Sequence, residues 1–231
     1  TPLSGEINTD TIYIRLTAAL AAGNYHGNIS LSTDGALTKW LPVSGTVTDT
    51  IPPVIQCVAP QLFCFNAGNG YTIPVITASD ISGIGNITFS ISGATVRNGT
   101  GSNASGIFNA GMNRILWTVT DNAGNSGTCT TTVIINHPVQ VNISDVFAVN
   151  PGGKANTIYI GYGPTSLTLT ANGSGGYLVA GNHYSYAWST GATTSSINVS
   201  PAIVGTYIYT VTITDDYGCT ATASKTITVV D

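Results

Sequence analysis

The sequence predicts an all-β chain built from tandem β-sandwich domains, and three observations lead to that fold class. Short runs alternate between polar and apolar residues, as half-buried strands do. Gly- and Asn-rich turn clusters without helical periodicity separate several of these runs. The motif Thr-x-Thr-Asp-x-x-Gly starts at Thr118 and returns at Thr212. A repeat at about the size of one sandwich domain indicates tandem copies of a single kind of unit.

The composition favours a folded protein with a neutral, hydroxyl-rich surface. Of the 231 residues 42% are apolar, which is enough for a core in each domain, and only 7% are charged, against roughly 25% in ordinary globular chains. The net charge is -4 and no basic run is present, so nucleic acid is excluded as a partner. No apolar stretch approaches the roughly 20 residues of a membrane helix, which argues against membrane insertion. We therefore expect an extracellular protein.

Prolines divide the chain into three expected domains. Residues 49–53 include two prolines and form a stiff linker, because proline fixes φ and restricts the residue before it. Pro138 marks the second boundary. The expected domains are residues 1–50, 51–137 and 138–231, a spacing close to that of immunoglobulin-type sandwiches.

The first domain is expected to be the C-terminal part of a sandwich, because it holds only three strand patterns, at residues 11–16, 25–31 and 36–47. Three strands cannot close two sheets, since each apolar face needs a partner layer. Upstream sequence or another chain would supply the remaining strands. Between the first two patterns, residues 17–22 fit one helical turn.

Further strand patterns fill the other two domains. In the second domain they span residues 54–58, 71–78, 86–91, 114–120 and 128–135, with turn clusters at 82–85 and 98–103. In the third they span residues 141–149, 166–171, 184–189, 195–199, 206–214 and 220–230. A Gly-x-Tyr triplet precedes a late strand at Tyr25 and again at Tyr207. It is similar to the tyrosine corner, whose hydroxyl bonds to backbone upstream.

The second domain contains Pro52-Pro53, Cys57, the segment Thr-Asp-Asn-Ala-Gly-Asn that begins at Thr120, and Cys129. In these features it resembles the HYR (hyalin-repeat) family of immunoglobulin-like modules. Many relatives carry a further cysteine pair; here Cys64 is present, but the segment expected to hold its partner reads Asp-Ile-Ser.

The third domain looks like a PKD-type module, through the segments Tyr-Ala-Trp-Ser-Thr-Gly from Tyr186, Gly-Thr-Tyr from Gly205 and Val-Thr-Ile-Thr-Asp from Val211. It lacks the acidic turn of that family. The first segment is similar to the closing half of immunoglobulin-like repeats. Such strings resemble the stalks of large repetitive bacterial cell-surface adhesins exported by the type IX pathway. The fold class implied is tandem immunoglobulin-like β-sandwich domains.

The HYR resemblance implies a disulfide between Cys57 and Cys129. Two buried thiols are the alternative. Closing a loop of this size would contribute about 4 kcal/mol in the chain-entropy model. Cys219 has no partner in its own domain, and Cys64 has no evident one. We expect both to be buried small hydrophobes. The cysteine spacings do not fit a zinc site.

Two interpretations are open for the oxygens of Asp80, Asp121 and Asn125, with Asp49 at the preceding linker. They suit a calcium site, since Ca2+ takes six to eight oxygen ligands. Alternatively, Asp121 and Asn125 form Asx-type turns that bond their own backbone. We favour the turns, and we expect no cofactor other than calcium.

The sequence does not predict an enzyme. The three histidines fall in three different domains, Glu6 is the only glutamate, and no Gly-x-Ser-x-Gly elbow is present. A catalytic base needs a nucleophile or second carboxylate within reach, and no convergent set is visible.

Each domain holds one tryptophan in a strand pattern. A sandwich core wants such a ring buried, whereas a glycan platform wants it exposed. We expect Trp117 and Trp188 in the core and leave Trp40 open. The Asp-Thr-Ile tripeptides at Thr11 and Thr50 resemble an O-glycosylation motif of the same bacterial group.

Three functions fit these observations. The first is a non-enzymatic stalk or filament segment in cell adhesion, whose partners are neighbouring immunoglobulin-like domains of the same long chain. The second is a subunit completed by strand addition, with other copies as partners in a fibre or homo-oligomer. The third is a carbohydrate-binding accessory that uses Trp40 or the tyrosine-rich segment 177–186 to bind surface glycans.

Overall fold

The computed structural model describes residues 11–17, 20–32, 34–35, 37–148, 153–179 and 183–231. Within these ranges the regular secondary structure is entirely β, with no helix. The predicted all-β class is therefore confirmed. The search of these residues for a helix able to cross a membrane finds none.

The chain divides into two compact units. One comprises Thr1–Gln56, Thr77–Ile87 and Thr118–Thr128, and the other comprises Cys57–Ile76, Thr88–Trp117 and Cys129–Asp231. The hydrogen-bonded sheets of the described residues follow a different division. Each sheet draws its strands from only one of the segments 1–50, 51–137 and 138–231, which we call the first, second and third modules.

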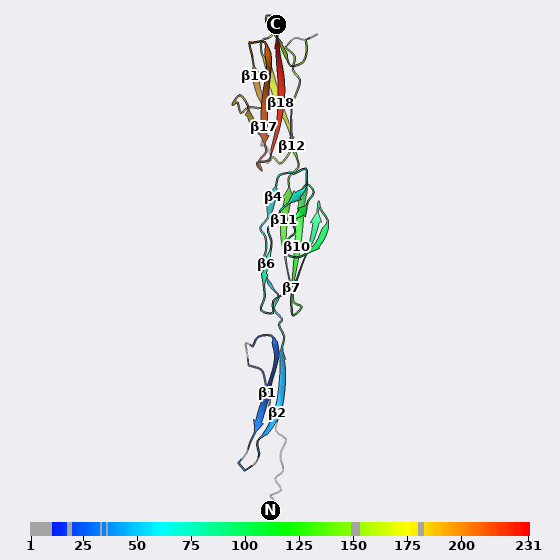
Figure 1. Ribbon diagram of the computed structural model, residues 1–231, viewed down its shortest axis with the longest axis vertical. Coiled ribbons are helices and arrows are strands. Elements are labelled where there is room, and N and C mark those ends of the chain that lie inside the picture. The colour runs from blue at the N-terminus through cyan, green and yellow to red at the C-terminus, as the bar shows by residue number, and fades with distance from the viewer. Residues whose placement is uncertain (1–10, 18–19, 33, 36, 149–152, 180–182) are drawn as a thin grey trace, which may run out of the picture. The chain divides into compact units, whose positions relative to one another are not determined.

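The first module is a single antiparallel hairpin, seen at the blue end of Figure 1. Strand β1 (Gly23–Leu31) pairs with β2 (Lys39–Val47) from Gly23 opposite Val47 to Leu31 opposite Lys39. The tyrosine corner is present, because the Tyr25 hydroxyl donates to the carbonyl oxygen of Ala21 at 2.8 Å.

The residues before β1 do not form the strand that the sequence predicts. The strand predicted at residues 11–16 is wrong, since these residues form no strand. Their side chains are exposed, and alternation alone does not supply the neighbouring strand that a ladder needs. The helical turn predicted at 17–22 includes residues 18–19, which lie outside the described residues.

The second module contains nine strands. They are β3 (Val54–Gln56), β4 (Gln61–Phe63), β5 (Gly70–Tyr71), β6 (Thr77–Ser79), β7 (Ile84–Gly93), β8 (Arg97–Thr100), β9 (Gly106–Ile107), β10 (Gly111–Asp121) and β11 (Ser126–Ile135). The main sheet has the order β4-β11-β10-β7-β8, while β3 pairs with β6 and β5 with β9. Residues 98–100 belong to β8, so the turn predicted at 98–103 is wrong for that part.

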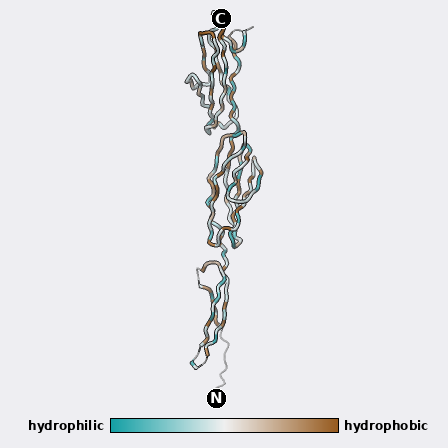
Figure 2. Tube along the Cα trace, viewed as in Figure 1, coloured by the Kyte–Doolittle hydropathy of each residue, from teal (hydrophilic) through white to brown (hydrophobic). Residues whose placement is uncertain are grey.

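Burial alternates along β10. Its odd-numbered residues from Asn113 to Asp121 are buried, and the residues between them are exposed or half-buried. One face of the strand therefore lies in the core, as the period-two pattern predicts. Figure 2 shows the same interleaving of hydrophobic and hydrophilic residues along the strands.

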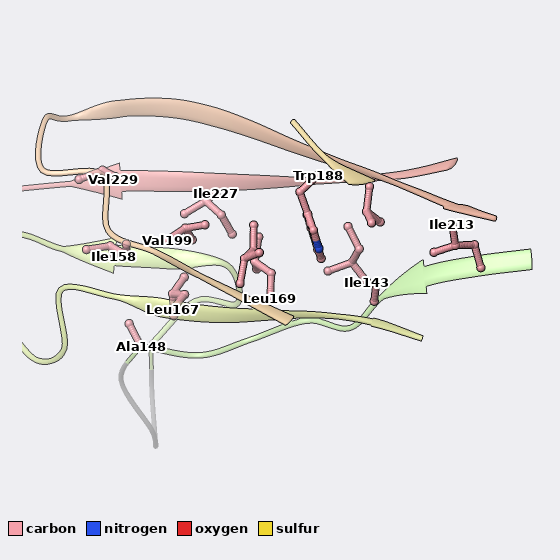
Figure 3. Close-up of a cluster of buried hydrophobic side chains, with 13 residues drawn as sticks. Ile143, Ala148, Ile158, Leu167, Leu169, Trp188, Val199, Ile213, Ile227 and Val229 are labelled. Atoms are coloured by element: carbon pink, nitrogen blue, oxygen red, sulfur yellow. The ribbon is translucent and has the colours of Figure 1, made fainter. Parts of the chain in front are cut away.

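The third module is a two-sheet sandwich. Its strands are β12 (Val139–Ile143), β13 (Thr157–Tyr159), β14 (Leu167–Gly175), β15 (Ser185–Trp188), β16 (Ser196–Val199), β17 (Gly205–Thr214) and β18 (Thr220–Val230). One sheet has the order β12-β14-β16 and the other β13-β18-β17-β15. Buried side chains from both sheets meet between them, among them Leu169, Trp188 and Ile227 (Figure 3). The Tyr207 hydroxyl donates to the carbonyl oxygen of Ile203 at 3.0 Å, so this corner is also present.

Candidate functional site

The junction between the second and third modules is built on one buried polar pair. The Asn136 side chain donates through Nδ2 to Oδ2 of Asp215 at 2.6 Å, and both residues are buried. Asn136 follows β11 directly, and its backbone N–H donates to the carbonyl oxygen of Phe63 at 2.8 Å. The last strand of the second module is thereby hydrogen-bonded to the third module. Both partners lie in the larger compact unit.

Asp215 accepts hydrogen bonds on both carboxylate oxygens. Besides Asn136, Oδ2 accepts from the backbone N–H of Tyr177, while Oδ1 accepts from the N–H groups of Tyr217 and Cys219, at 2.8 to 2.9 Å. Burial is the largest single influence on this group and raises its pKa, but the four hydrogen bonds together hold the pKa below its usual 3.8. Asp215 is therefore a buried carboxylate that the junction stabilises in its ionised form.

Two disulfides take up all four cysteines. Cys57 bonds to Cys129 within the second module, with Cα atoms 6.1 Å apart. Cys64 bonds to Cys219, with Cα atoms 5.4 Å apart, and so joins the second module to the third. The first pairing is the one that the HYR resemblance implied. Both separations lie within the usual range for disulfides.

The expectation that Cys64 and Cys219 remain thiols is wrong. Each lacks a partner inside its own module, which is why reasoning module by module left both unpaired. The partner lies across the boundary, where β4 ends at Phe63 and the turn from Asp215 brings Cys219 beside it. The signal in the sequence was the pair of leftover cysteines in adjacent modules.

A carboxylate cluster lies within the smaller compact unit, where Asp49 of the first module meets Asp80 and Asp121 of the second. Asp49, Asp80 and Asp121 each place one oxygen within 4.8 Å of the others'. The Asp49 oxygen Oδ2 is buried and has no hydrogen-bond partner among the described residues. Hydrogen bonds, above all the one from the Ile51 N–H, lower the pKa of Asp49. Three converging carboxylates with an unsatisfied buried oxygen fit a hard cation that prefers oxygen ligands, such as Ca2+.

The same residues also form the turns that the sequence favoured. Oδ1 of Asp121 accepts from the N–H groups of Ala123 and Asn125, both at 2.8 Å, and Oδ2 accepts from the Asn125 side chain at 2.9 Å. The Asn125 amide also donates to the carbonyl oxygen of Asp49 at 3.1 Å. Gly124 has φ +96°, and Gly218 at the equivalent place in the third module has φ +79°. The two copies of the motif form the same turn, and glycine suits its left-handed position.

The calcium interpretation stays a prediction. We expect the whole chain to melt at a higher temperature in Ca2+ than in chelator. At a free Ca2+ concentration one hundred times Kd, binding should add about 2.7 kcal/mol to the free energy of unfolding. Asp80→Asn should abolish the difference but keep the fold, because an amide oxygen can still accept the hydrogen bonds from Ser82. Asp145→Asn is the control, since Asp145 lies at the surface beside Lys225. Equal melting temperatures in both solutions would contradict a calcium site.

The tryptophans differ in exposure. Trp117 and Trp188 are buried, whereas Trp40 is 64% exposed. Tyr177 and Tyr217 stack on each other with ring centroids 4.1 Å apart and planes within 3°, so each covers a face that a sugar would need. The carbohydrate hypothesis, with Trp40 or the segment 177–186 as the binding surface, stays a prediction.

The remaining predicted site residues, Thr11 and Thr50, are both exposed, as acceptors of a glycan must be. Their modification stays a prediction. Among the described residues, the three carboxylates are the one cluster of three or more His, Cys, Asp or Glu side chains placed to share a metal ion.

No protein-family model matches the chain, and no curated protein matches it either. Solved structures with a similar arrangement include protocadherin gammaB7 EC3-6, described as a cis-dimer, at 14% identity and TM-score 0.42 over 90% of this chain and 58% of that one. Mouse cadherin-23 EC22-24 has 14% identity and a TM-score of 0.38, over 90% of this chain and 74% of that one. The fibronectin(III)-like modules of Clostridium thermocellum CbhA have 16% identity and a TM-score of 0.35, over 77% of this chain and 93% of that one. The chain thus spans less than two thirds of the protocadherin. Its own strands define it as a protein of tandem immunoglobulin-like β-sandwich domains.

Proposed function

We propose that this chain is a non-enzymatic stalk or filament segment of a secreted multidomain surface protein that acts in cell adhesion. The observation that carries the proposal is the covalent bond between consecutive modules, Cys64 to Cys219, set beside the buried pair of Asn136 and Asp215. A bond of this kind fixes one module against the next. A stalk needs that constraint, whereas a ligand pocket or an active site inside one module does not.

The disulfides also support the location. Such bonds persist in oxidising compartments and are rare in the cytosol, so two of them in a chain with four cysteines favour an extracellular protein. The finer assignment, to HYR-like and PKD-like modules of a bacterial surface adhesin exported by the type IX pathway, rests on the sequence motifs. On this proposal the partners are neighbouring modules of the same long chain.

Strand addition is a second candidate function, and the first module favours it. Within the described residues β1 and β2 pair only with each other, and a lone two-stranded hairpin is marginally stable in water. Its large apolar side chains Leu31, Trp40 and Leu41 are exposed. A further strand added to either edge would satisfy backbone groups and cover apolar surface. The added strand would come from another copy of this chain.

Scattering combined with sedimentation of the whole oxidised chain separates these proposals. A stalk segment is expected to sediment as a monomer with a radius of gyration well above the value of about 17 Å for a compact chain of this length. A monomer with a value near 17 Å would contradict the stalk. Strand addition predicts concentration-dependent polymers that dissociate when Trp40 and Leu41 are replaced by serine. The same two replacements are not expected to alter a monomer.

A further inference from the structure

The two disulfides overlap along the chain. This arrangement determines which covalent bonds carry tension when the two ends of the chain are pulled. In chain order the first cysteine bonds to the third and the second to the fourth, with sequence separations of 72 and 155 residues. A force applied to the two ends of a cross-linked chain is carried by its shortest covalent path. The chain outside that path remains slack, because a cross-link holds the two ends of its loop together and the pull cannot separate them.

The shortest path runs through the bond between the modules. It follows the chain to Cys64, crosses the two sulfurs to Cys219 and leaves through the final 12 residues, 220–231. The alternative path crosses from Cys57 to Cys129 and must then follow 90 residues to Cys219. The bond inside the second module therefore lies off the loaded path.

Within the second and third modules the chain along this path contains extended strands, whereas the first module, on the same path, is a hairpin that can open and release length. The last segment of the path, after Cys219, is β18, and the stretch before Cys64 contains β3 and β4. A strand rises about 3.3 Å per residue, and a fully stretched chain reaches only about 3.3 to 3.6 Å. Pulling on these strands from their two ends releases almost no length. The chain of both modules that lies off this path does not carry the tension covalently.

We propose that the Cys64–Cys219 disulfide is the covalent tether that carries tension through this segment, which lets the second and third modules transmit tension without being pulled apart. The proposal rests on the stalk function above and adds to it the route of the force. Hydrogen bonds surround the tether on the third-module side, since Asn136 donates to Sγ of Cys219 at 3.4 Å and to Asp215. Cys219 is buried, whereas Cys64 is exposed.

The test is single-molecule pulling of the whole chain by its two ends, first without reductant and then, for the wild type, after reduction of both disulfides. Reduction of the wild-type chain is expected to add 155 residues of length, which is about 510 to 560 Å at full extension. In the variant with Cys64→Ser and Cys219→Ser, the other disulfide still hides 72 residues, so the gain over the oxidised wild type is the difference, 83 residues, or about 270 to 300 Å.

The matched control is the variant with Cys57→Ser and Cys129→Ser. Because that bond lies off the path, the fully stretched length should equal that of the oxidised wild type, even where the second module is destabilised. Extended length is a covalent property and does not depend on folding, and non-reducing peptide mapping of the same samples verifies each bond. The proposal is overturned if peptide mapping of the wild type lacks the Cys64–Cys219 bond, or if the control gains length. Either result leaves the scattering test of the stalk unaffected.

Discussion

Replacing Trp117 by alanine is expected to lower the free energy of unfolding of the second module by about 3 to 5 kcal/mol. The side chain is fully buried, its ring packs against Phe89 with centroids 5.5 Å apart, and its indole N–H donates to the Thr131 hydroxyl at 3.1 Å. The substitution would leave a cavity and remove one of the hydrogen bonds of the Thr131 hydroxyl, which also donates to the carbonyl oxygen of Val58. Denaturant unfolding followed by far-ultraviolet circular dichroism measures the change.

Trp40→Ala provides the matched control for this experiment. Trp40 also lies on a strand, but its side chain is mostly exposed, so the free energy of unfolding should change by no more than about 0.5 kcal/mol. Equal losses in the two variants would show that Trp117 is not a core residue.

Asp215→Asn should lower the free energy of unfolding of the third module by about 2 to 3 kcal/mol at neutral pH. In the wild type, N–H groups of Asn136 and Tyr177 donate to Oδ2 of Asp215. An asparagine would place an NH2 group, which is itself a donor, opposite some of the N–H groups that surround this position. Asp145→Asn is the control, because Asp145 is exposed and forms an ion pair with Lys225 and a hydrogen bond from the Asn156 side chain, and exposed pairs of this kind contribute about 0 to 1 kcal/mol. Thermal melting of both variants gives the comparison.

The pH dependence of the free energy of unfolding, compared between the wild type and Asp215→Asn, is a second readout. The pKa of Asp215 is lower in the folded chain than its usual 3.8. Its stabilising contribution is therefore fully present above about pH 4 and is lost as the pH falls through the folded-state pKa. The difference between wild type and Asp215→Asn should be constant from pH 7 to 5 and should narrow below 3.8. A difference that widens on acidification would contradict this account.

Long alternating strands were predictable from the sequence because their signal is contained in the strand itself. The patterns at residues 114–120, 128–135, 206–214 and 220–230 fall inside β10, β11, β17 and β18. Among the short strands, β3, β15 and β16 lie within predicted patterns, but β4 and β13 were not predicted. Strands β4 and β13 have three residues each and pair in parallel with β11 and β18. Three residues are too few to show a period, and their pairing depends on a distant strand.

The candidate site divides in a similar way. The turn at Asp121 and its copy at Asp215 could be predicted, because an Asx turn depends on residues two and four positions away. The bond from Cys64 to Cys219 and the contact from Asn136 to Asp215 could not. Both depend on how two modules meet, and no pattern within one module contains that information.

The overlap of the two disulfides also imposes an order in time. Synthesis proceeds from the N-terminus, so Cys57 and Cys129 are both available once the second module has emerged, whereas Cys219 follows 90 residues later. Until then Cys64 is a solitary thiol beside a possible wrong partner, Cys129. A chain that ends after the second module would keep that thiol exposed and would be prone to covalent dimers. Formation of both native bonds without a rearrangement by thiol–disulfide exchange therefore requires Cys64 to stay reduced until the final hairpin of the third module arrives.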